Sequence, residues 1–446
     1  MDATSIRAAV AAMAGGGTSS ARLVEAARVA AGAHAELNAL AWVDWEAAAA
    51  AAHTLDVEAR AGRLRGPLHG VPVSIKDLFN VRGMPTRAGT RAPLPDLGPA
   101  EAELVTRLRA AGALVFAKTN LHEIALGATG ENRWTGDVRN PRDPARQAGG
   151  SSSGAAVAVA CGIGLGAVGS DTGGSVRIPA AFCGVTGFKP SFGAIPLAGG
   201  LHLSWTCDHA GPLARSVDDC ALLYEAMSAR RADQGAVPRA PRLALPAGWL
   251  EPRLAPAVRE RFELVLERLR AHGASIEPVA IPALPLALGC YTTIVRAEAA
   301  YVHRAALAAG AEGFSDLVLP PLQDGARLLA GQYFEAMRVR EQVRAGLDAV
   351  LARCDALVLP TSPVPPPLRG QAEVEVAGGA TMSTRDAVLG QTLAFSLVGV
   401  PALSLPMGDA AALPASLQLV AARDADARLL ALGRWVEEAL GSAAAG

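Results

Sequence analysis

The chain has 446 residues, 51% of them hydrophobic and 19% charged, so it can bury one large core or two ordinary ones and is not intrinsically disordered. Its 41 basic and 42 acidic residues give a net charge of −1 and are spread along the sequence, which excludes a strongly basic protein that binds nucleic acid or a membrane surface. We therefore expect small neutral molecules as partners, with no nucleic acid and no membrane.

The amino-terminal part of the sequence predicts a pair of helices. Residues 4–62 are rich in alanine with helical periodicity, and a glycine run at 15–17 is followed by Thr18, Ser19 and Ser20. This order predicts the end of one helix and the cap of the next. The first 17 residues contain neither a basic cluster nor an apolar stretch long enough for a signal peptide or a spanning helix, so we expect a cytoplasmic protein.

From residue 70 onward, short apolar runs alternate with helical stretches such as residues 101–112 and 255–273. The runs typical of buried strands are 71–75, 113–117, 165–170, 242–246, 356–360, 402–406 and 416–420. Alternating elements of this kind predict an α/β fold with a large, mixed, mostly parallel sheet covered by helices on both faces.

No repeat period or low-complexity linker divides the chain, so we expect one domain over residues 1–446. Within it we distinguish a helical region at 1–65, a central core at 66–220, and a remainder at 221–446 that completes the sheet and covers the pocket. The cysteines lack CxxC spacing and predict buried free thiols instead of disulfides or a metal site. They are Cys161, Cys183, Cys207, Cys220, Cys290 and Cys354.

The segment GGSSSG at residues 149–154 runs into an apolar helical stretch and allows three interpretations. A flexible linker is disfavoured because linkers stay polar, whereas these serines would cap the helix that follows. A phosphate-binding loop needs Lys and Ser or Thr where Ala155 and Ala156 stand. The GxSxG elbow of α/β hydrolases would make Ser152 the nucleophile, but the last histidine is His303, too early for the usual order of Ser, acid and His.

A second segment, GSDTGGSVR at residues 169–177, indicates nucleophilic chemistry. Gly173 and Gly174 leave the backbone free of side chains, so successive N–H groups can converge beside the hydroxyl of Ser175. A serine needs a base, and no histidine lies close to either segment. Lys76 ends an apolar strand, where desolvation would lower its pKa and leave a neutral amine, although a lysine in that context is more often a surface residue.

Together, GVPVSIKD, GGSSSG and GSDTGGSVRIP resemble the lysine segment and the two serine segments of the amidase signature family, in the same order and approximate spacing. The resemblance covers nearly the whole chain and includes LNALAWVDWEAA, KTNLHEIALG, RNPRDPARQAGG, FCGVTGFKPSFG, GVPALSLPMG and SLQLV. It implies the amidase-signature fold and a serine hydrolase of C–N bonds that needs neither a cofactor nor a metal.

The resemblance also implies roles for particular residues. Ser175 would be the nucleophile and Lys76 the base, and Ser151, which would follow a cis peptide bond after Gly150, would pass protons between them. The oxyanion hole would consist of consecutive backbone N–H groups, those of Thr172, Gly173, Gly174 and Ser175.

Two charged residues flank the second serine segment. Asp171 precedes the glycine pair and Arg177 follows the serine, and we expect hydrogen bonds from both to hold the turn together. A direct role in substrate binding is the less favoured interpretation.

Five positions depart from the family pattern. Ser153 and Ala155 stand where glycine and serine are common, and Ser416 replaces a frequent glycine. Leu389 occupies a position that is acidic in the glutamine-using amidotransferase subunits of the family, and Ile178 stands where those subunits usually have glutamine. A site for the ammonium group of glutamine is therefore expected to be missing, which favours a free-standing enzyme.

The substrate is less clearly indicated than the chemistry. Loops expected to border the site contain Trp134, His202, Trp205 and His209, which favour an apolar or aryl group, although each Trp fits plain packing equally well. Residues 332–343 form a helical stripe that would cover the pocket or belong to the core. A small amide or a carbamate (urethane) fits the implied chemistry.

Alternative functions stay open at this point. One is an A-type subunit of a glutamine amidotransferase that acts on charged tRNA with partner chains, and another is a hydrolase of the urea or allophanate type. A catalytically silent binding protein is disfavoured because all three implied catalytic side chains are present. For the main interpretation we expect a monomer or a homodimer.

Overall fold

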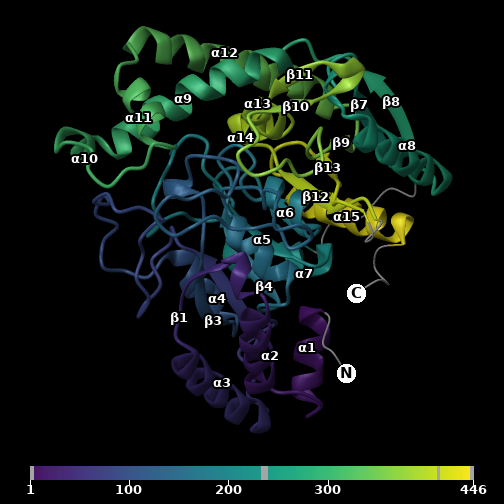
Figure 1. The fold of residues 1–446 in the computed structure, drawn as a ribbon. Coiled ribbons are helices and arrows are strands. Elements are labelled where there is room, and N and C mark those ends of the chain that lie inside the picture. Colours follow the sequence, from purple (N-terminus) through teal and green to yellow (C-terminus); the bar gives the residue numbers. More distant parts are fainter. Residues whose placement is uncertain (1–4, 233–239, 409–411, 442–446) are drawn as a thin grey trace.

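The computed structural model describes residues 5–232, 240–408 and 412–441, so residues 1–4 of the predicted helical region lie outside it. An 11-stranded sheet runs through the centre of the molecule (Figure 1). Across this sheet the strands are β1 (Leu40–Val43), β3 (Leu114–Thr119), β2 (Pro72–Lys76), β4 (Gly166–Ser170), β6 (Ala210–Ala214), β5 (Thr186–Lys189), β12 (Ala402–Pro406), β13 (Ser416–Val420), β9 (Ala356–Pro360), β7 (Arg242–Pro246) and β8 (Ser275–Val279). A separate ribbon pairs β10 (Glu373–Glu375) with β11 (Thr381–Ser383).

The predicted large mixed sheet is confirmed, and each of the apolar runs predicted as strands forms one. Parallel pairs occur in two groups, β3–β2–β4 and β9–β7–β8. Between these groups the strands run antiparallel, as does β1 at the edge. Strands such as β6 are harder to recognise from sequence, since Gly211 and Pro212 have low strand propensity.

Helices cover both faces of the sheet. The helices are α1 (Ile6–Ala14), α2 (Ser20–Ala33), α3 (Trp45–Arg60), α4 (Glu103–Ala110), α5 (Ser153–Ala160), α6 (Arg177–Cys183), α7 (Val217–Ser228), α8 (Pro256–Ala271), α9 (Ala287–Val302), α10 (Arg304–Ala308), α11 (Leu319–Ala326), α12 (Ala330–Leu351), α13 (Thr384–Gly390), α14 (Leu393–Val398) and α15 (Asp426–Leu440). On β4, a Cβ at Gly166 would meet Leu223 of α7, whereas a Cβ at Gly169 would meet Ser152 beside α5. These positions point to opposite faces of a strand, so α7 and α5 enclose β4 between them.

Helices lie at the periphery on both sides of the central strands, and the two ends of the chain share one core. Helices α1–α3 lie at the bottom of Figure 1 and α9–α12 at the top, on either side of the sheet's central strands. The predicted cap is present, since the Ser19 side chain accepts a hydrogen bond from the Arg22 N–H at the start of α2. One cluster of buried side chains contains both Ile6 and Val436, which supports our proposal of a single domain.

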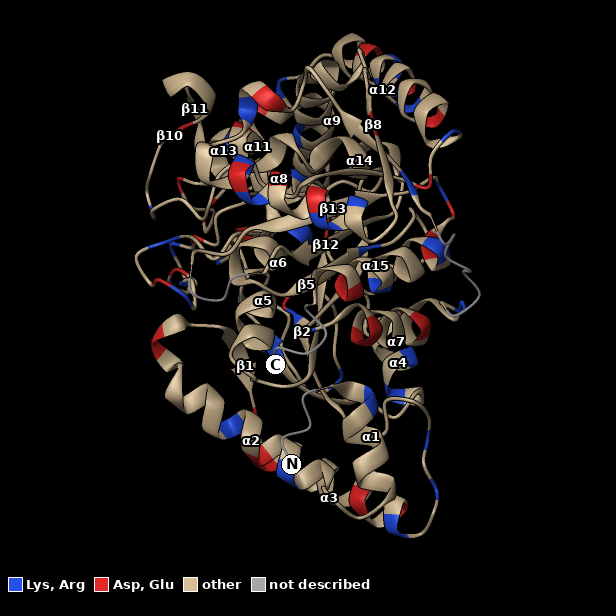
Figure 2. Cartoon of the chain, turned by 90° about the vertical axis from the view of Figure 1, so that its right-hand side faces the viewer, with Lys and Arg blue, Asp and Glu red and all other residues tan. Residues whose placement is uncertain are grey.

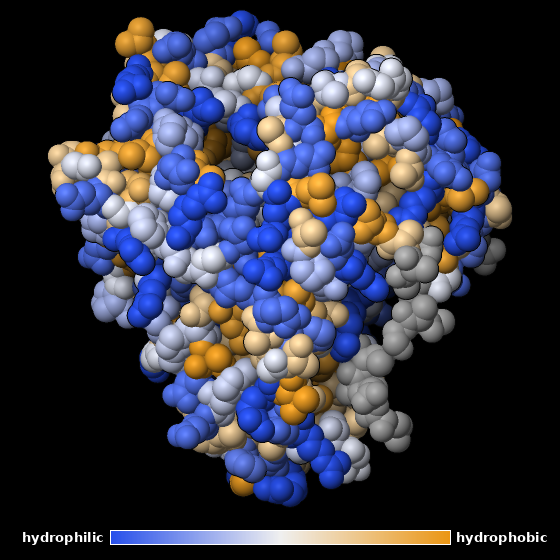
Figure 3. Space-filling model, viewed as in Figure 1, coloured by the Kyte–Doolittle hydropathy of each residue, from blue (hydrophilic) through white to orange (hydrophobic). Residues whose placement is uncertain are grey.

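The surface carries no dominant charge. Acidic and basic residues are interspersed over the face in Figure 2, and hydrophobic residues form small separate patches in Figure 3. Among the described residues, no helix is both long and apolar enough to cross a membrane. All six cysteines are free thiols, and burial is complete or nearly so for four of them, with Cys161 and Cys354 partly exposed.

Candidate active site

The lysine and the start of the second serine segment lie at the carboxyl ends of two neighbouring parallel strands, where Ser151 of the first segment contacts the lysine. Lys76 is the last residue of β2 and Ser170 the last of β4. The Nζ atom of Lys76 lies 2.7 Å from the Oγ of Ser151 and 2.8 Å from the Oγ of Ser170. The peptide bond between Gly150 and Ser151 is cis, as the resemblance implies. Sequence reasoning placed Lys76 beside Ser151 and missed Ser170.

Lys76 is in an environment that suits a base. Its side chain has no solvent-exposed surface, and this burial lowers the pKa of Lys76 to about 7, although the charges of Asp171 and Asp208 oppose the shift. Near neutral pH a large fraction of the amine is therefore uncharged and can accept a proton from the serine that it contacts.

Ser175 faces a cavity of about 400 Å³. Its carbonyl accepts a hydrogen bond from the N–H of Ser152, at 3.1 Å, which fixes the second serine segment beside the first. Within the described residues, no hydrogen bond joins the Ser175 hydroxyl directly to Ser151. Catalytic hydrogen bonds often form only once substrate is bound, so this arrangement is compatible with a proton relay.

The turn before Ser175 presents free backbone donors. None of the N–H groups of residues 172–175 donates to another residue in the described part of the chain. Gly174 has a φ of +140°, and a Cβ at Gly173 would clash with the hydroxyl oxygen of Tyr291. Both positions therefore require glycine. These N–H groups, which precede or belong to Ser175, are free to donate to a bound ligand.

A buried ion pair holds this turn. Arg177 forms a two-point contact with Asp171, with Nε–Oδ2 and Nη2–Oδ1 distances of 3.0 and 2.9 Å, and neither side chain is solvent-exposed. Burial alone would raise the pKa of Asp171, but the Arg177 guanidinium and other nearby cations hold it well below its usual range. Arg177 also donates to Ser396 and Gln418, at 2.7 and 2.6 Å. The pair thus connects the turn to α14 and β13, which is the structural role expected for it.

Asp208 is a second buried carboxylate at the turn, and sequence reasoning missed it. It accepts a hydrogen bond from the Thr172 hydroxyl at 2.7 Å and from the N–H groups of Leu203 and Ser204 at 2.9–3.1 Å. Thr392 supports the other side, where its hydroxyl donates to the Gly173 carbonyl at 2.6 Å. The turn before Ser175 is therefore fixed by groups from segments that are far apart in sequence.

The structure argues against Ser152 as the nucleophile. Its side chain is fully buried, and its Oγ exchanges hydrogen bonds with the backbone of Ser170, donating to the carbonyl at 3.1 Å and accepting from the N–H at 3.2 Å. Ser152 occupies the N-cap position of α5, but its side chain makes no capping bond, so the expectation that the serines cap this helix was wrong. The hydroxyl is used to join α5 to β4 instead.

The cavity wall comes mainly from α9, α11, α13 and the loop after β3. Leu389 lines it, as predicted. Its apolar lining includes Leu126, Leu203, Val295, Leu317, Pro320, Pro321 and Val388. The stripe at residues 332–343 lies in α12, which packs on α9 and does not line the cavity, so of its two interpretations the structure supports packing.

Four residues in loops predicted to border the pocket lie outside this lining. The Trp134 ring donates a hydrogen bond to Glu123 at 3.0 Å, and His202 pairs with Asp208 at 3.1 Å. Trp205 is 41% exposed and packs edge-on against Tyr301 on the outside of α9. Loop position in the sequence was the only signal for them, and it did not give the direction of the side chains. His209, the fourth such residue, is buried with its Nδ1 2.7 Å from the Cys207 carbonyl.

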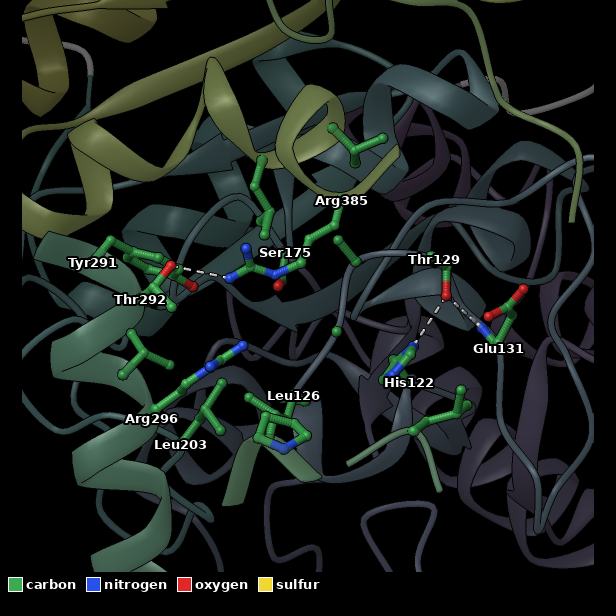
Figure 4. A pocket seen from close by; sticks show the side chains of 18 of the residues that line it. His122, Leu126, Thr129, Glu131, Ser175, Leu203, Tyr291, Thr292, Arg296 and Arg385 are labelled. Atoms are coloured by element: carbon green, nitrogen blue, oxygen red, sulfur yellow. Dashed lines mark hydrogen bonds between the residues drawn. The ribbon is translucent and has the colours of Figure 1, made fainter. Parts of the chain in front are cut away.

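His122 and Tyr291 line the cavity beside Ser175, and the sequence did not single them out (Figure 4). Burial lowers the pKa of His122 to about 4, so its ring is neutral near pH 7. Burial also raises the pKa of the Tyr291 phenol well above its usual range, which keeps it protonated. In the described ranges, no group of three or more His, Cys, Asp or Glu side chains could hold a metal ion.

The chain belongs to the amidase family, since the family model described as Amidase matches residues 22–430. It is similar to a solved structure described as "Crystal structure of amidase", at 49% identity and a TM-score of 0.94 over 97% of this chain and 99% of that one. The native peptide amidase of Stenotrophomonas maltophilia is 28% identical with a TM-score of 0.81, over 98% and 97% of the two chains.

A curated relative carries a different name. The chain is 35% identical to the A subunit of the glutamyl-tRNA(Gln) amidotransferase of Symbiobacterium thermophilum (strain DSM 24528 / JCM 14929 / IAM 14863 / T), over 85% of each chain. The amidase-signature fold and membership of an enzyme family that acts on C–N bonds are thus established, while relatives inside the family differ in their reactions.

Proposed function

We propose that this protein is a free-standing hydrolase that cleaves amide bonds of small, largely apolar or aryl molecules through an ester on Ser175. The observation that carries the proposal is the fully buried Lys76, with a pKa of about 7, in contact with Ser151. The next residue, Ser152, is hydrogen-bonded to the carbonyl of Ser175, which lines the cavity. This arrangement supplies a base, a relay and a nucleophile in one place.

Each step then has a group to perform it. Neutral Lys76 takes the proton of Ser151, which takes the proton of Ser175 as the Ser175 oxygen attacks the substrate carbonyl. The free N–H groups of residues 172–175 stabilise the oxyanion. Ser151 returns a proton to the leaving amine, and a water molecule then attacks the ester by the reverse relay to release the acid.

The apolar part of the cavity supports the substrate class. Leu389 and Val388 of α13 and Val295 of α9 line it together with two prolines of α11, and none of these side chains can pair with an ammonium group. A carbamate fits the same machinery because its carbonyl passes through the same acyl transfer to serine.

A second candidate is an amidotransferase A-type subunit that releases ammonia from glutamine for a partner chain. The names of the curated relatives favour it, since others at similar identity carry the same name as the Symbiobacterium protein. Leu389 in the cavity wall favours the free-standing enzyme, because the acidic residue expected for glutamine is replaced by an apolar one.

Activity of the isolated chain separates the two candidates. The purified protein is assayed without partner chains on a panel of aryl amides, aliphatic amides, carbamates and free glutamine, with and without hydroxylamine. We expect turnover of apolar amides and diversion of their acyl groups to hydroxamates. Glutamine turnover that exceeds that of every apolar amide would support the amidotransferase role instead.

A further inference from the structure

A second, much smaller cavity lies beside the one that Ser175 lines. Its volume is about 10 Å³, which is close to the space that one water molecule requires. Ala125 and Leu203 line both cavities, so the two are neighbours. The proposed reaction steps use none of the polar side chains that line the smaller one. These are Ser170, Thr172, His202, Asp208 and His209.

The imidazole ring of His209 has one nitrogen that lacks a partner. Its Nδ1 lies 2.7 Å from the carbonyl oxygen of Cys207 and 3.1 Å from that of Asp171. Carbonyl oxygens only accept hydrogen bonds, so Nδ1 carries the hydrogen. Burial lowers the pKa of His209 well below its usual range, so the ring is neutral and Nε2 is an acceptor. This Nε2 atom is buried, and no described residue donates to it.

The hydroxyl of Ser170 has a hydrogen without an acceptor. Its oxygen accepts a hydrogen bond from Lys76 at 2.8 Å, and Lys76 is its one partner in the described part of the chain. The carboxylate of Asp208, by contrast, is already occupied by Thr172, His202 and the backbone N–H groups of residues 203–204. The small cavity therefore combines a donor that lacks an acceptor with an acceptor that lacks a donor.

We propose that the small cavity binds one water molecule, which accepts a hydrogen bond from Ser170 and donates one to Nε2 of His209. The second hydrogen of this water can be donated to the hydroxyl oxygen of Thr172, whose own hydrogen is used on Asp208. Three hydrogen bonds are about the usual number for a buried water in a protein. The catalytic consequence of the water rests on the proposed function, whereas the water site itself does not.

The water determines which hydroxyl the lone pair of neutral Lys76 faces. The Nζ atom contacts two hydroxyls, at 2.7 Å to Ser151 and 2.8 Å to Ser170, but a neutral amine has only one lone pair. If Ser170 donated to Nζ, it would occupy the lone pair that must take the proton of Ser151. With its hydrogen bound to the water, Ser170 only accepts from Lys76, and the lone pair is left for Ser151. His209 is thus a positioning residue that acts through the water.

The kinetic test compares His209→Phe with His209→Gln. Both variants lose the Nδ1 hydrogen bonds to the backbone, but only glutamine keeps an acceptor near the position of Nε2. The assay is run about two pH units above the Lys76 pKa of about 7, where the amine is neutral. There kcat for an apolar amide should be about threefold to tenfold lower in His209→Phe than in His209→Gln, the effect of one hydrogen bond.

Ser170→Ala supplies the control that a merely structural role of His209 would fail. Without the Ser170 hydroxyl nothing competes for the lone pair, so His209→Phe and His209→Gln should have equal kcat values in the Ser170→Ala background. Equal values in the background with Ser170, or an undiminished difference in the Ser170→Ala background, would overturn the positioning role.

High-resolution diffraction separates the water site from the proposed function. Crystals of the wild-type protein should show one water within hydrogen-bond distance of Ser170 Oγ and His209 Nε2, and crystals of His209→Phe should lack it. This result would support the site even if the chain hydrolyses no amide. A wild-type cavity without density for a water would overturn the site even if amides are hydrolysed and His209→Phe does not fold. A water that keeps its place in His209→Phe would likewise overturn it.

Discussion

The turn that carries Ser175 and the wall formed by α9, α11 and α13 enclose the same cavity but are built differently. The turn is buried, and Asp171, Arg177 and Asp208 tie it to the rest of the fold. The wall is partly exposed and combines leucine, valine and proline with arginines in half-exposed ion pairs. Half-exposed ion pairs contribute little to folding stability, so the charged residues of the wall can be substituted with little loss of stability. Substituting one partner of the buried pair in the turn would be strongly destabilising. Under the proposed function, the turn performs the chemistry and the wall selects the substrate.

The largest expected effect is on the proposed catalytic side chains. Ser175→Ala should reduce kcat for apolar amides by about 10⁴-fold or more, because no other hydroxyl faces the cavity in the same position. Lys76→Ala and Ser151→Ala should each reduce kcat by several orders of magnitude, because the proton relay then lacks its base or its bridging serine. Steady-state kinetics of the three variants measure these losses. Full activity in Ser175→Ala would show that Ser175 is not the nucleophile, so the turn and the wall could no longer be contrasted as catalytic and substrate-binding regions.

Breaking the buried ion pair should affect both stability and activity. Arg177→Gln leaves Asp171 as an uncompensated buried charge, which typically costs about 3–5 kcal/mol. The free energy of unfolding, measured in urea, should fall by this amount. The kcat of the molecules that stay folded should also fall, because the turn before Ser175 loses its support. Arg385→Gln is the matched control from the wall, where we expect less than about 1 kcal/mol. Equal losses of stability would show that the two regions do not differ as proposed.

The pH dependence tests the state of the base. Lys76 is charged below its pKa of about 7 and neutral above it, and only the neutral form accepts a proton. The value of kcat/KM should therefore rise about tenfold per pH unit well below pH 7, more slowly close to pH 7, and level off above it. A rate that falls from pH 5 to pH 7 would rule out a lysine base.

A metal chelator should leave the pH profile of kcat/KM unchanged. Activity that EDTA abolishes and zinc restores would contradict a metal-free relay.

The smallest effect is expected at the neighbouring serine. Ser152→Ala removes a hydroxyl that only joins α5 to the backbone of Ser170, so it should cost about 1 kcal/mol in stability and less than about tenfold in kcat. The comparison with Ser151→Ala is informative because the two serines are adjacent. A loss as large as that of Ser175→Ala would restore the elbow interpretation with Ser152 as nucleophile.

The turn could be predicted from the sequence because its parts lie in short contiguous motifs. Asp171, the glycine pair, Ser175 and Arg177 fall within seven residues, so local backbone geometry largely determines their arrangement. Lys76 required one further step, the pairing of β2 with β4, and that parallel register also explains why Ser170 reaches the same amine. Asp208 was missed because its contact with Thr172 depends on how a distant loop packs.

The wall could not be predicted in the same way. Arg296 and Arg385 are 89 residues apart and meet only because the Arg385 side chain contacts Thr292 on α9. Trp134 and Trp205 were expected at the pocket from their position in loops, but their rings face Glu123 and Tyr301. Helix packing and side-chain direction decide such contacts, and neither follows from local periodicity. Leu389 was found because the family pattern marks its position.

The most direct test of the account is to locate the acyl group during turnover. The wild-type protein is mixed with an aryl ester or amide, quenched in acid within the first turnovers, digested and analysed by mass spectrometry. The account predicts an acyl ester on Ser175 that is absent from Ser175→Ala and disappears when hydroxylamine is added before the quench. An acyl group on Ser152, or turnover without any acylated serine, would contradict it.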